Sequence, residues 1–289
     1  MILYFLTYLT LNNMAQSTLQ QFNFNFENDF IYETDKFYNH SSKFDFIYYK
    51  NNTKDIKYNI TYKNEMYTPE EHELYYVPEG DMPYTSLSEI SGGLTVSNKT
   101  ISNHLEIGLG YTGKYTYSAE IMEGIHNITP AKPVFNAWDT QKKFTPIARV
   151  SFQNKYKITL LEGYLDYIHN TGISISNFRS FVNTGGQIRL GLLDESFGLY
   201  NSYTNNLNIL EDNKFHAYIF AGYNLKYTFN DMTMRGLDII NNQYEYNSGI
   251  GIKYNSWNIS LINNVESKRF ETQSTSDFGY SNVMIGYKF

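Results

Sequence analysis

The sequence predicts an all-β protein, a closed antiparallel transmembrane β-barrel of about 12 strands with a short helix in an extracellular loop. Three observations predict this fold. Apolar and polar residues alternate over long stretches, aromatic residues make up 17% of the chain with 28 Tyr and 20 Phe, and no apolar run is as long as a membrane helix needs. Only helices and closed barrels satisfy their backbone hydrogen bonds inside a bilayer. Tyr, apolar with a polar tip, suits the rims of such a barrel.

The alternation is clearest in four stretches. Residues 56–63, 104–111, 215–227 and 283–289 place apolar or aromatic side chains at every second position. Because side chains of a strand point alternately to its two faces, one face of each stretch suits lipid and the other suits a polar lumen. A tilted strand crosses a bilayer with roughly 9–11 residues, close to the length of these stretches. A terminal aromatic residue, here Phe289, is also typical of bacterial outer-membrane barrels.

The segments between the strands predict turns, loops and one helix. Asn pairs, which indicate turns, stand at 51–52, 205–206, 241–242 and 263–264. Residues 67–84 hold three of the six prolines and indicate an exposed loop, and residues 131–146 indicate another. Residues 119–126 lack the alternation and predict two helical turns.

The sequence predicts one domain preceded by a signal peptide. Residues 1–15 are apolar and predict a signal peptide cleaved after Ala15, although no Lys or Arg precedes the apolar part. Residues 16–289 then form a single outer-membrane β-barrel domain. The net charge of -6 gives no electrostatic basis for binding nucleic acid. The absence of cysteine excludes disulfides and thiolate chemistry.

Two places offer groups for chemistry. His126 ends the predicted helical segment. Glu27 and Asp29 lie two residues apart and share one face of the first strand, which suits a site for a hard cation; two solvated carboxylates are the alternative interpretation. Asn28 falls in phase with the Phe residues of the lipid face, which is unusual for an amide unless a loop covers that level.

Several segments, taken together and in order, resemble one family. They are Asn28-Asp29, Thr34-Asp35-Lys36-Phe37-Tyr38, Met66-Tyr67-Thr68-Pro69, Gly80-Asp81-Met82-Pro83-Tyr84, Gly124-Ile125-His126, Trp138-Asp139-Thr140-Gln141 and Gly185-Gly186-Gln187-Ile188-Arg189-Leu190-Gly191. In this order they are similar to segments of the lipid A 3'-O-deacylase family (LpxR). The likeness covers residues 26–191, and the last third matches only as barrel strands.

The resemblance implies a twelve-stranded barrel whose site lies between the wall and a short loop helix. It implies hydrolysis of the esters that carry the 3'-linked acyl chains of lipid A, with a divalent cation, usually calcium. It assigns Asn28, Asp29 and His126 to catalysis, and we expect Asp29 and Glu27 to bind the metal. Expected substrate contacts come from Lys36, Asn39, Ser41 and Tyr84.

The chain departs from the family pattern at three positions. Asn39 stands where members often have Thr, so Ser41 or Ser42 is the candidate for the missing hydroxyl. Leu74 stands near a Lys of some members, and Thr85-Ser86 replaces a small-residue pair after Tyr84. These departures leave the nucleophile open between a water activated by His126 and a serine.

The functional hypothesis is therefore an outer-membrane esterase. It predicts a bacterial outer-membrane location, lipid A or lipopolysaccharide as substrate, and a monomer. A passive porin or an adhesin-type barrel is the alternative, because a barrel fold by itself does not determine function.

Overall fold

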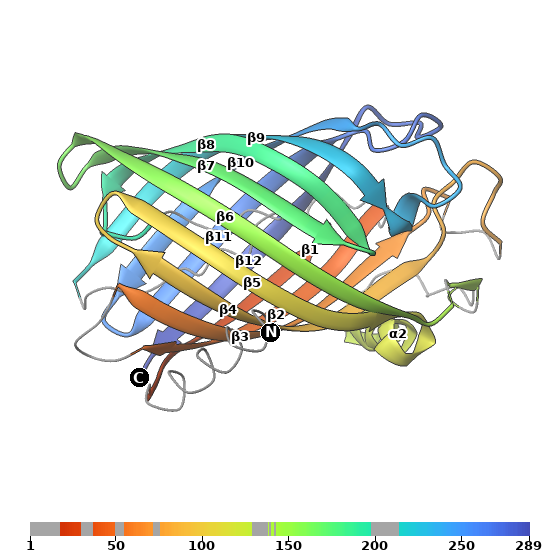
Figure 1. The fold of residues 1–289 in the computed structure, drawn as a ribbon, viewed down its shortest axis with the longest axis horizontal. Helices are drawn as coiled ribbons and strands as arrows, with labels where there is room; N and C mark the ends of the chain where they lie inside the picture. The colour runs from red at the N-terminus through yellow and green to blue at the C-terminus, as the bar shows by residue number, and fades with distance from the viewer. Residues whose placement is uncertain are drawn as a thin grey trace, which may run out of the picture.

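The computed structural model is a closed barrel that confirms the predicted fold class. The structure describes residues 18–29, 37–49, 55–71, 76–128, 138, 140–141, 143–197 and 214–289. Within them, twelve strands pair antiparallel in sequence order, and the first strand pairs with the last to close the ring (Figure 1). The proposed signal peptide lies outside the described residues.

The strands run from 11 to 17 residues, long enough to cross a bilayer at a tilt. They are β1 Thr18–Asn28, β2 Phe37–Tyr49, β3 Ile56–Thr68, β4 Thr85–Ser97, β5 Ile101–Thr112, β6 Thr145–Leu161, β7 Leu165–Ser176, β8 Arg179–Leu192, β9 His216–Asp231, β10 Asn242–Tyr254, β11 Trp257–Ser267 and β12 Asp277–Lys288. A 3-10 turn η1 (Lys114–Thr116) and the helix α2 (Ser118–Ile128) follow β5, and a second 3-10 turn η3 (Met232–Met234) follows β9. The helix confirms the prediction for residues 119–126.

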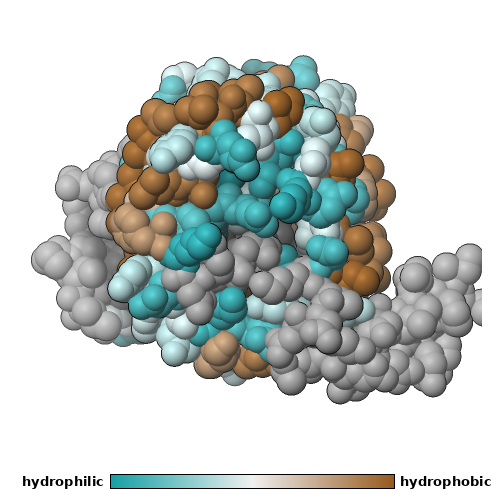
Figure 2. Space-filling model, turned by 90° about the vertical axis from the view of Figure 1, so that its left-hand side faces the viewer, coloured by the Kyte–Doolittle hydropathy of each residue, from teal (hydrophilic) through white to brown (hydrophobic). Residues whose placement is uncertain are grey.

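The two faces of each strand differ as the alternation predicts. Along β9, the even-numbered positions 216, 218 and 220 are buried in the lumen, while Ile219 is 57% exposed. A view onto the end opposite α2 shows hydrophobic residues around the rim and hydrophilic residues in the middle (Figure 2). The described helices include none that is both long and apolar enough to cross a bilayer.

Charged pairs fill the middle of the lumen. Arg149 on β6 contacts Glu89 on β4 at 2.6 Å and also contacts Glu106 on β5. Nearer the α2 end, Arg269 pairs with Glu266 at 2.6 Å. Since buried charges are tolerated only when they are paired, these ladders make the lumen a packed interior.

Apolar side chains close the lumen at the end that carries α2. This cluster consists of Phe37, Tyr67, Met82, Leu87, Ile147, Phe178, Met234, Phe270, Phe278 and Tyr280. It joins strand residues to residues of the connecting loops. Just below it the lumen holds a cavity of ≈ 60 Å³, lined in part by Lys63, Glu89 and Arg149.

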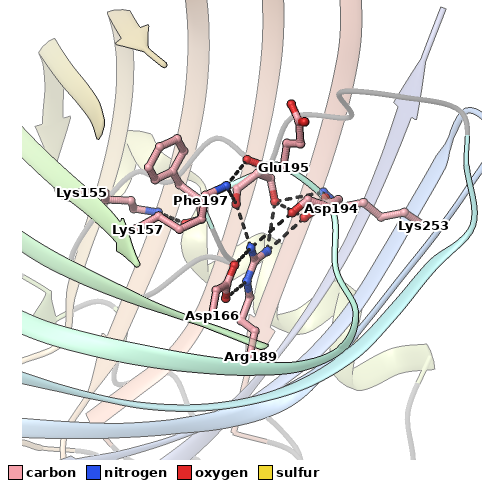
Figure 3. Close-up of polar contacts among 9 residues, drawn as sticks. Lys155, Lys157, Asp166, Arg189, Asp194, Glu195, Phe197 and Lys253 are labelled. Carbon is pink, nitrogen blue, oxygen red and sulfur yellow. Dashed lines mark hydrogen bonds and ion pairs between the residues drawn. The ribbon is translucent and has the colours of Figure 1, made fainter. Parts of the chain in front are cut away.

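The first residues of the loop after β8 narrow the lumen at the opposite end. Figure 3 shows Asp194 from this loop lying against Arg189 of β8 and Lys253 of β10. Arg189 also holds Asp166 of β7 at 2.6 Å. The backbone carbonyl of Phe197 accepts a hydrogen bond from Lys155 Nζ at 2.8 Å. Residues 193–197 therefore form a polar plug, a name kept for this segment below.

One predicted turn is wrong. Asn263 and Asn264 lie in the middle of β11, where Asn264 is 1% exposed and pairs in register with Asn247. The turn between β10 and β11 is formed instead by Asn255 and Ser256, with a φ of 52° at Asn255. A polar lumen accepts amides along a strand, so an Asn pair is a weaker turn signal in a barrel than in a soluble sheet.

Candidate functional site on the outer wall

A row of polar side chains faces outward at the α2 end of the first four strands. Register places Asn28 opposite His40, His40 opposite Met66, and Met66 opposite Ser86. The next row toward the membrane centre runs Phe26, Ser42, Asn64 and Ser88. Residues directly opposite each other in an antiparallel pair share a face. The third row, Phe24, Phe44, Tyr62, Ile90 and Leu109, is apolar, with Leu109 67% exposed, so all three rows lie on the lipid-facing side.

The polar rows are covered although they face outward. Met66 and Ser86 are fully buried, and Ser88 is 3% exposed. The cover is α2, which lies outside the ring of strands (Figure 1). Met122 of α2 packs in one cluster with Met66 and Tyr84 of the wall and with Trp138. A polar patch that would be costly against lipid is thus enclosed between wall and helix.

Hydrogen bonds tie the cover to the wall. Ser86 Oγ lies 2.6 Å from Thr116 Oγ1 and donates to Gln141 Oε1 at 3.0 Å. Asn64 Nδ2 donates to Ser88 Oγ at 2.8 Å and to the backbone carbonyl of Thr116 at 3.4 Å. η1 is therefore anchored on β3 and β4, which fixes where α2 begins.

Two groups suited to chemistry stand side by side on β2. His40 Nε2 lies 2.8 Å from Ser42 Oγ. His40 is 1% exposed and its ring packs edge-on against Phe26, with centroids 4.9 Å apart. Asn28, 8% exposed, lies directly across the ladder from His40. The amide expected beneath the loop helix is thus buried on the outer face, beside an imidazole that sequence reasoning did not select.

The carboxylates proposed for the metal are placed differently. Glu27 faces the lumen, where its Oε1 accepts a hydrogen bond from Asn282 Nδ2 at 2.9 Å. It therefore lies on the opposite face from Asn28. Asp29 is 1% exposed at the bend where β1 ends. Within the residues that the structure describes, no three His, Asp or Glu side chains gather as a metal cluster.

Ser41 and Ser42 are separated by the wall. Ser41 pairs in register with Glu27 and Glu65 and lies on the lumen face. Ser42 is half-buried on the outer face. Of the two hydroxyls that the sequence offers, the structure brings only Ser42 to the covered patch.

Tyr84 anchors the other side of the patch. It is 3% exposed, and its ring lies 4.9 Å from that of Trp138. Burial, with a smaller contribution from the Asp81 carboxylate, raises the pKa of Tyr84 to about 12. Its phenol is therefore neutral at any physiological pH and can donate a hydrogen bond.

The remaining predicted positions are only partly described. Residue 126 lies in α2, one helical turn after Met122, but its side chain is outside what the structure describes, as is that of Asn39. Lys36 lies outside the described residues altogether. The residues that sequence reasoning missed are His40, Asn64, Ser86 and Thr116. The signal for three of them was available, because a polar residue in phase with lipid-facing positions on a strand must be covered by something.

Comparison with known proteins agrees with this geometry. The family model described as outer membrane protein LpxR matches residues 1–289. Among solved structures, LpxR from Salmonella typhimurium matches with a TM-score of 0.81 at 16% identity, covering 93% of this chain and 100% of that chain. At this identity the match shows the shared fold.

Other barrels match more weakly. The β-domain of the Bordetella autotransporter BrkA has a TM-score of 0.46 at 10% identity, covering 94% of this chain and 99% of that one. The translocator domain of NalP from Neisseria meningitidis has 0.47 at 8%, with 94% and 88% covered. No curated protein sequence matches the chain significantly.

The family match and the barrel place the protein in the bacterial outer membrane. The connections between β3 and β4 and between β5 and β6 are long and lie at the α2 end, although the connection between β8 and β9 at the other end is long as well. Most connections at the other end are short, so we take the α2 end as the extracellular end, as in other barrels of this membrane. The chain belongs to the family of the outer membrane protein LpxR.

Proposed function

We propose that the protein is a lipid A 3'-O-deacylase that hydrolyses the ester of one or more 3'-linked acyl chains. The observation that carries this proposal is the covered polar patch on the lipid-facing wall, at the extracellular end. Lipid A lies in the outer leaflet, so its acyl esters reach this level of the wall without leaving the membrane. A site for a soluble substrate would open to the lumen or to water instead.

Ester hydrolysis requires two kinds of group. A base must activate the nucleophile, and a donor must stabilise the oxyanion that forms on the carbonyl. The family resemblance assigns the base to His126, whose ordinary pKa suits proton transfer near neutral pH. Asn28 is the proposed oxyanion donor, since its amide is buried on the outer face of the wall, within the covered patch. Tyr84, Asn39 and Lys36 are proposed to hold the sugar and phosphate groups.

Calcium is proposed as the cofactor, and Asp29 is the residue proposed to hold it. Asp29 follows Asn28 in the chain at the end of β1, and a carboxylate together with an amide oxygen is the hard-oxygen chemistry that calcium prefers. When bound, the ion would polarise the ester carbonyl. Glu27 is less suited to this role, because its carboxylate lies on the lumen face and is engaged by Asn282.

The porin alternative is disfavoured by the filled lumen. The apolar cluster closes the extracellular end, the polar plug narrows the other end, and ion pairs fill the space between them. A pore function would also give no role to the covered polar patch on the outer wall. An adhesin would bind its partner through its extracellular loops. That function would not require a histidine–serine pair on the wall.

Mass spectrometry of lipid A tests the proposal. The chain is expressed in a Gram-negative host that lacks this activity, and extracted lipid A is compared with that from the empty host. Loss of a mass equal to a 3'-linked acyl group supports the proposal. Unchanged lipid A, with the barrel folded in the outer membrane, contradicts it.

A further inference from the structure

An exposed aromatic cluster borders the covered patch on the side of β5 and β6. It consists of Tyr111 near the end of β5, Tyr115 in η1 and Phe144 just before β6. The ring centroids of Tyr111 and Phe144 lie 6.0 Å apart in a stacked arrangement, and those of Tyr115 and Phe144 lie 6.1 Å apart. More than half of the surface of Tyr115 and of Phe144 is exposed. These three residues are called the aromatic platform below.

Register places the aromatic platform at the level of the covered patch. Tyr111 lies opposite Ser88 of β4 and Pro146 of β6, so it continues the polar row that contains Ser88. The apolar row, with Leu109, comes next toward the membrane centre. The Tyr111 hydroxyl donates to the backbone carbonyl of Tyr115 at 3.1 Å, which holds η1 at this rim. The aromatic platform therefore lies where the acyl chains of the outer leaflet meet the headgroups.

Two lysines flank the aromatic platform. Lys114 Nζ lies 5.2 Å from the centroid of the Tyr115 ring, and Lys143 directly precedes Phe144. Both lysine side chains are exposed, and within the part of the chain that the structure describes neither forms an ion pair. Arg149 in the lumen, in contrast, contacts two carboxylates. Two cations without an acidic partner can each donate hydrogen bonds to an anionic ligand.

This combination of groups indicates the class of ligand. An aromatic face packs against the C–H face of a sugar ring, an ammonium group donates hydrogen bonds to a phosphate, and the apolar row below accepts acyl chains. A phosphorylated and acylated sugar offers all three partners. Phosphatidylglycerol offers acyl chains and a phosphate, but it has no sugar ring to lie on the aromatic side chains.

Resting on the proposed function, we propose that the aromatic platform, with Lys114 and Lys143, binds a phosphorylated glucosamine ring of lipid A. The sugar lies on the rings of Tyr115 and Phe144, and its phosphate lies between the two ammonium groups. The acyl chains then run down the wall past Leu109. These residues hold the substrate and take no part in the chemistry, so their loss weakens binding.

The aromatic platform extends the substrate contacts proposed above. Asn39 belongs to β2 and Tyr84 directly precedes β4, whereas the aromatic platform belongs to β5, η1 and the residue before β6. Thr116 links the two regions, because it follows Tyr115 in the chain and its hydroxyl lies 2.6 Å from that of Ser86 in the patch. A disaccharide headgroup can therefore extend from the patch across η1 to the aromatic platform.

The test measures binding to the purified full-length barrel in detergent micelles by native mass spectrometry. The probe is bisphosphorylated lipid A in which ethers replace the 3'-linked esters, so that no turnover occurs. The double variant Lys114→Gln/Lys143→Gln is expected to weaken binding at least about tenfold. Tyr115→Ala/Phe144→Ala is expected to weaken it to a similar extent.

The matched controls lie at the other end of the barrel. Lys99→Gln and Tyr164→Ala remove a lysine that is 88% exposed and a tyrosine that is 53% exposed. Both variants are expected to bind the ether probe as the wild-type barrel does. A similar loss of binding in the controls would show that exposed lysines and aromatic residues attract lipid A wherever they stand, and it would overturn the proposal.

Two further probes identify the ligand. Lipid A without phosphates is expected to bind equally to the wild-type barrel and to Lys114→Gln/Lys143→Gln, because the lysines recognise the phosphate. Phosphatidylglycerol is expected to bind at least about tenfold more weakly than the ether probe and to lose nothing in Tyr115→Ala/Phe144→Ala. Equal losses of phosphatidylglycerol and of the ether probe in both double variants would show a general surface for anionic lipids and overturn the proposal.

Turnover of ordinary lipid A separates this inference from the proposed function. Lys114→Gln/Lys143→Gln is expected to raise KM at least about tenfold and to leave kcat unchanged. Unchanged binding of the ether probe in both double variants would overturn the inference while the deacylase function stands. If the wild-type barrel leaves lipid A intact, the proposed function fails and the ether probe still decides. Binding that depends on the aromatic platform and its lysines supports the headgroup site, and binding that is independent of them overturns it.

Discussion

Asn28 and His40 lie directly opposite each other across the β1–β2 ladder, on the lipid-facing side of the wall. Their neighbours Glu27 and Ser41 are also opposite each other but face the lumen. A step of one residue along either strand therefore leads from the covered patch to the interior of the barrel. Each candidate group can be assigned to one face, and matched variants on the two faces distinguish them.

The first prediction concerns the oxyanion donor. Asn28→Ala is expected to lower the rate of lipid A deacylation by about 100-fold or more, because one preorganised donor is lost. Asn25→Ala is its matched control on the same strand, since Asn25 is 2% exposed on the lumen face. Rates are measured on purified protein in mixed micelles. Equal losses in both variants would mean that the effect is structural.

The second prediction concerns the cation. Chelation of calcium is expected to abolish deacylation, and Asp29→Asn is expected to raise the calcium concentration for half-maximal rate by roughly tenfold or more. Glu27→Gln should leave this concentration unchanged, because Glu27 faces the lumen and is held by Asn282. A similar rise in both variants would place both carboxylates on the ion.

The third prediction concerns the cover. Met122 is 3% exposed against Met66, so Met122→Ala removes buried contact that is typically worth about 2–5 kcal/mol. The barrel should still fold, but α2 should become sensitive to protease and deacylation should fall. Glu123→Ala, on an exposed position of the same helix, should change neither. Protease resistance of Met122→Ala would show that α2 is held by other contacts.

The fourth prediction concerns the pH range of this cover. The pKa of Tyr84 rises on folding from 10.0 to about 12, chiefly because the phenol is buried. Its neutral form therefore stabilises the folded state fully below pH 10, and this contribution is lost as the pH rises through 12. In a Trp257→Phe background, fluorescence of Trp138 should change over this window in the parent and not in Tyr84→Phe. The same change in both would assign the transition to another group.

The fifth prediction concerns the polar plug. Arg189→Ala removes the ion-pair partner of the buried Asp166, while Asp194 keeps Lys253, and loss of such a buried partner typically costs about 3–5 kcal/mol. The urea midpoint of unfolding should fall. Lys99→Ala should have almost no effect, because Lys99 and Glu195 are 88% and 70% exposed.

Liposomes that contain the wild-type barrel should not swell in isotonic sugar; rapid swelling would restore the porin hypothesis.

The alternation of residues was enough to predict the barrel and its lumen face. It also placed Asn28 on the outer face and implied a cover, which α2 provides. What the sequence does not reveal is register between strands. Nothing in the local pattern indicates that His40 lies opposite Asn28 or that Ser86 bonds Thr116, because these contacts join separate strands and a loop.

Composition was misleading inside the barrel. Asn263-Asn264 resembles a turn, yet both residues are strand residues, and Asn264 faces a polar lumen that a soluble protein does not have. Glu27 and Asp29 were expected to act together because they share a strand face. By the alternation along β1, the face that they share is the lumen face. The wall of the barrel therefore lies between Glu27 and the covered patch. Burial depends on the closed shape, which emerges only from all twelve pairings.

The measurement that tests the central claim most directly is mass spectrometry of lipid A from cells that express the wild-type chain or the His126→Ala variant, with equal amounts of folded barrel. The account predicts loss of a 3'-linked acyl group with the wild-type chain and intact lipid A with the variant. Intact lipid A in both, or deacylated lipid A in both, would contradict it.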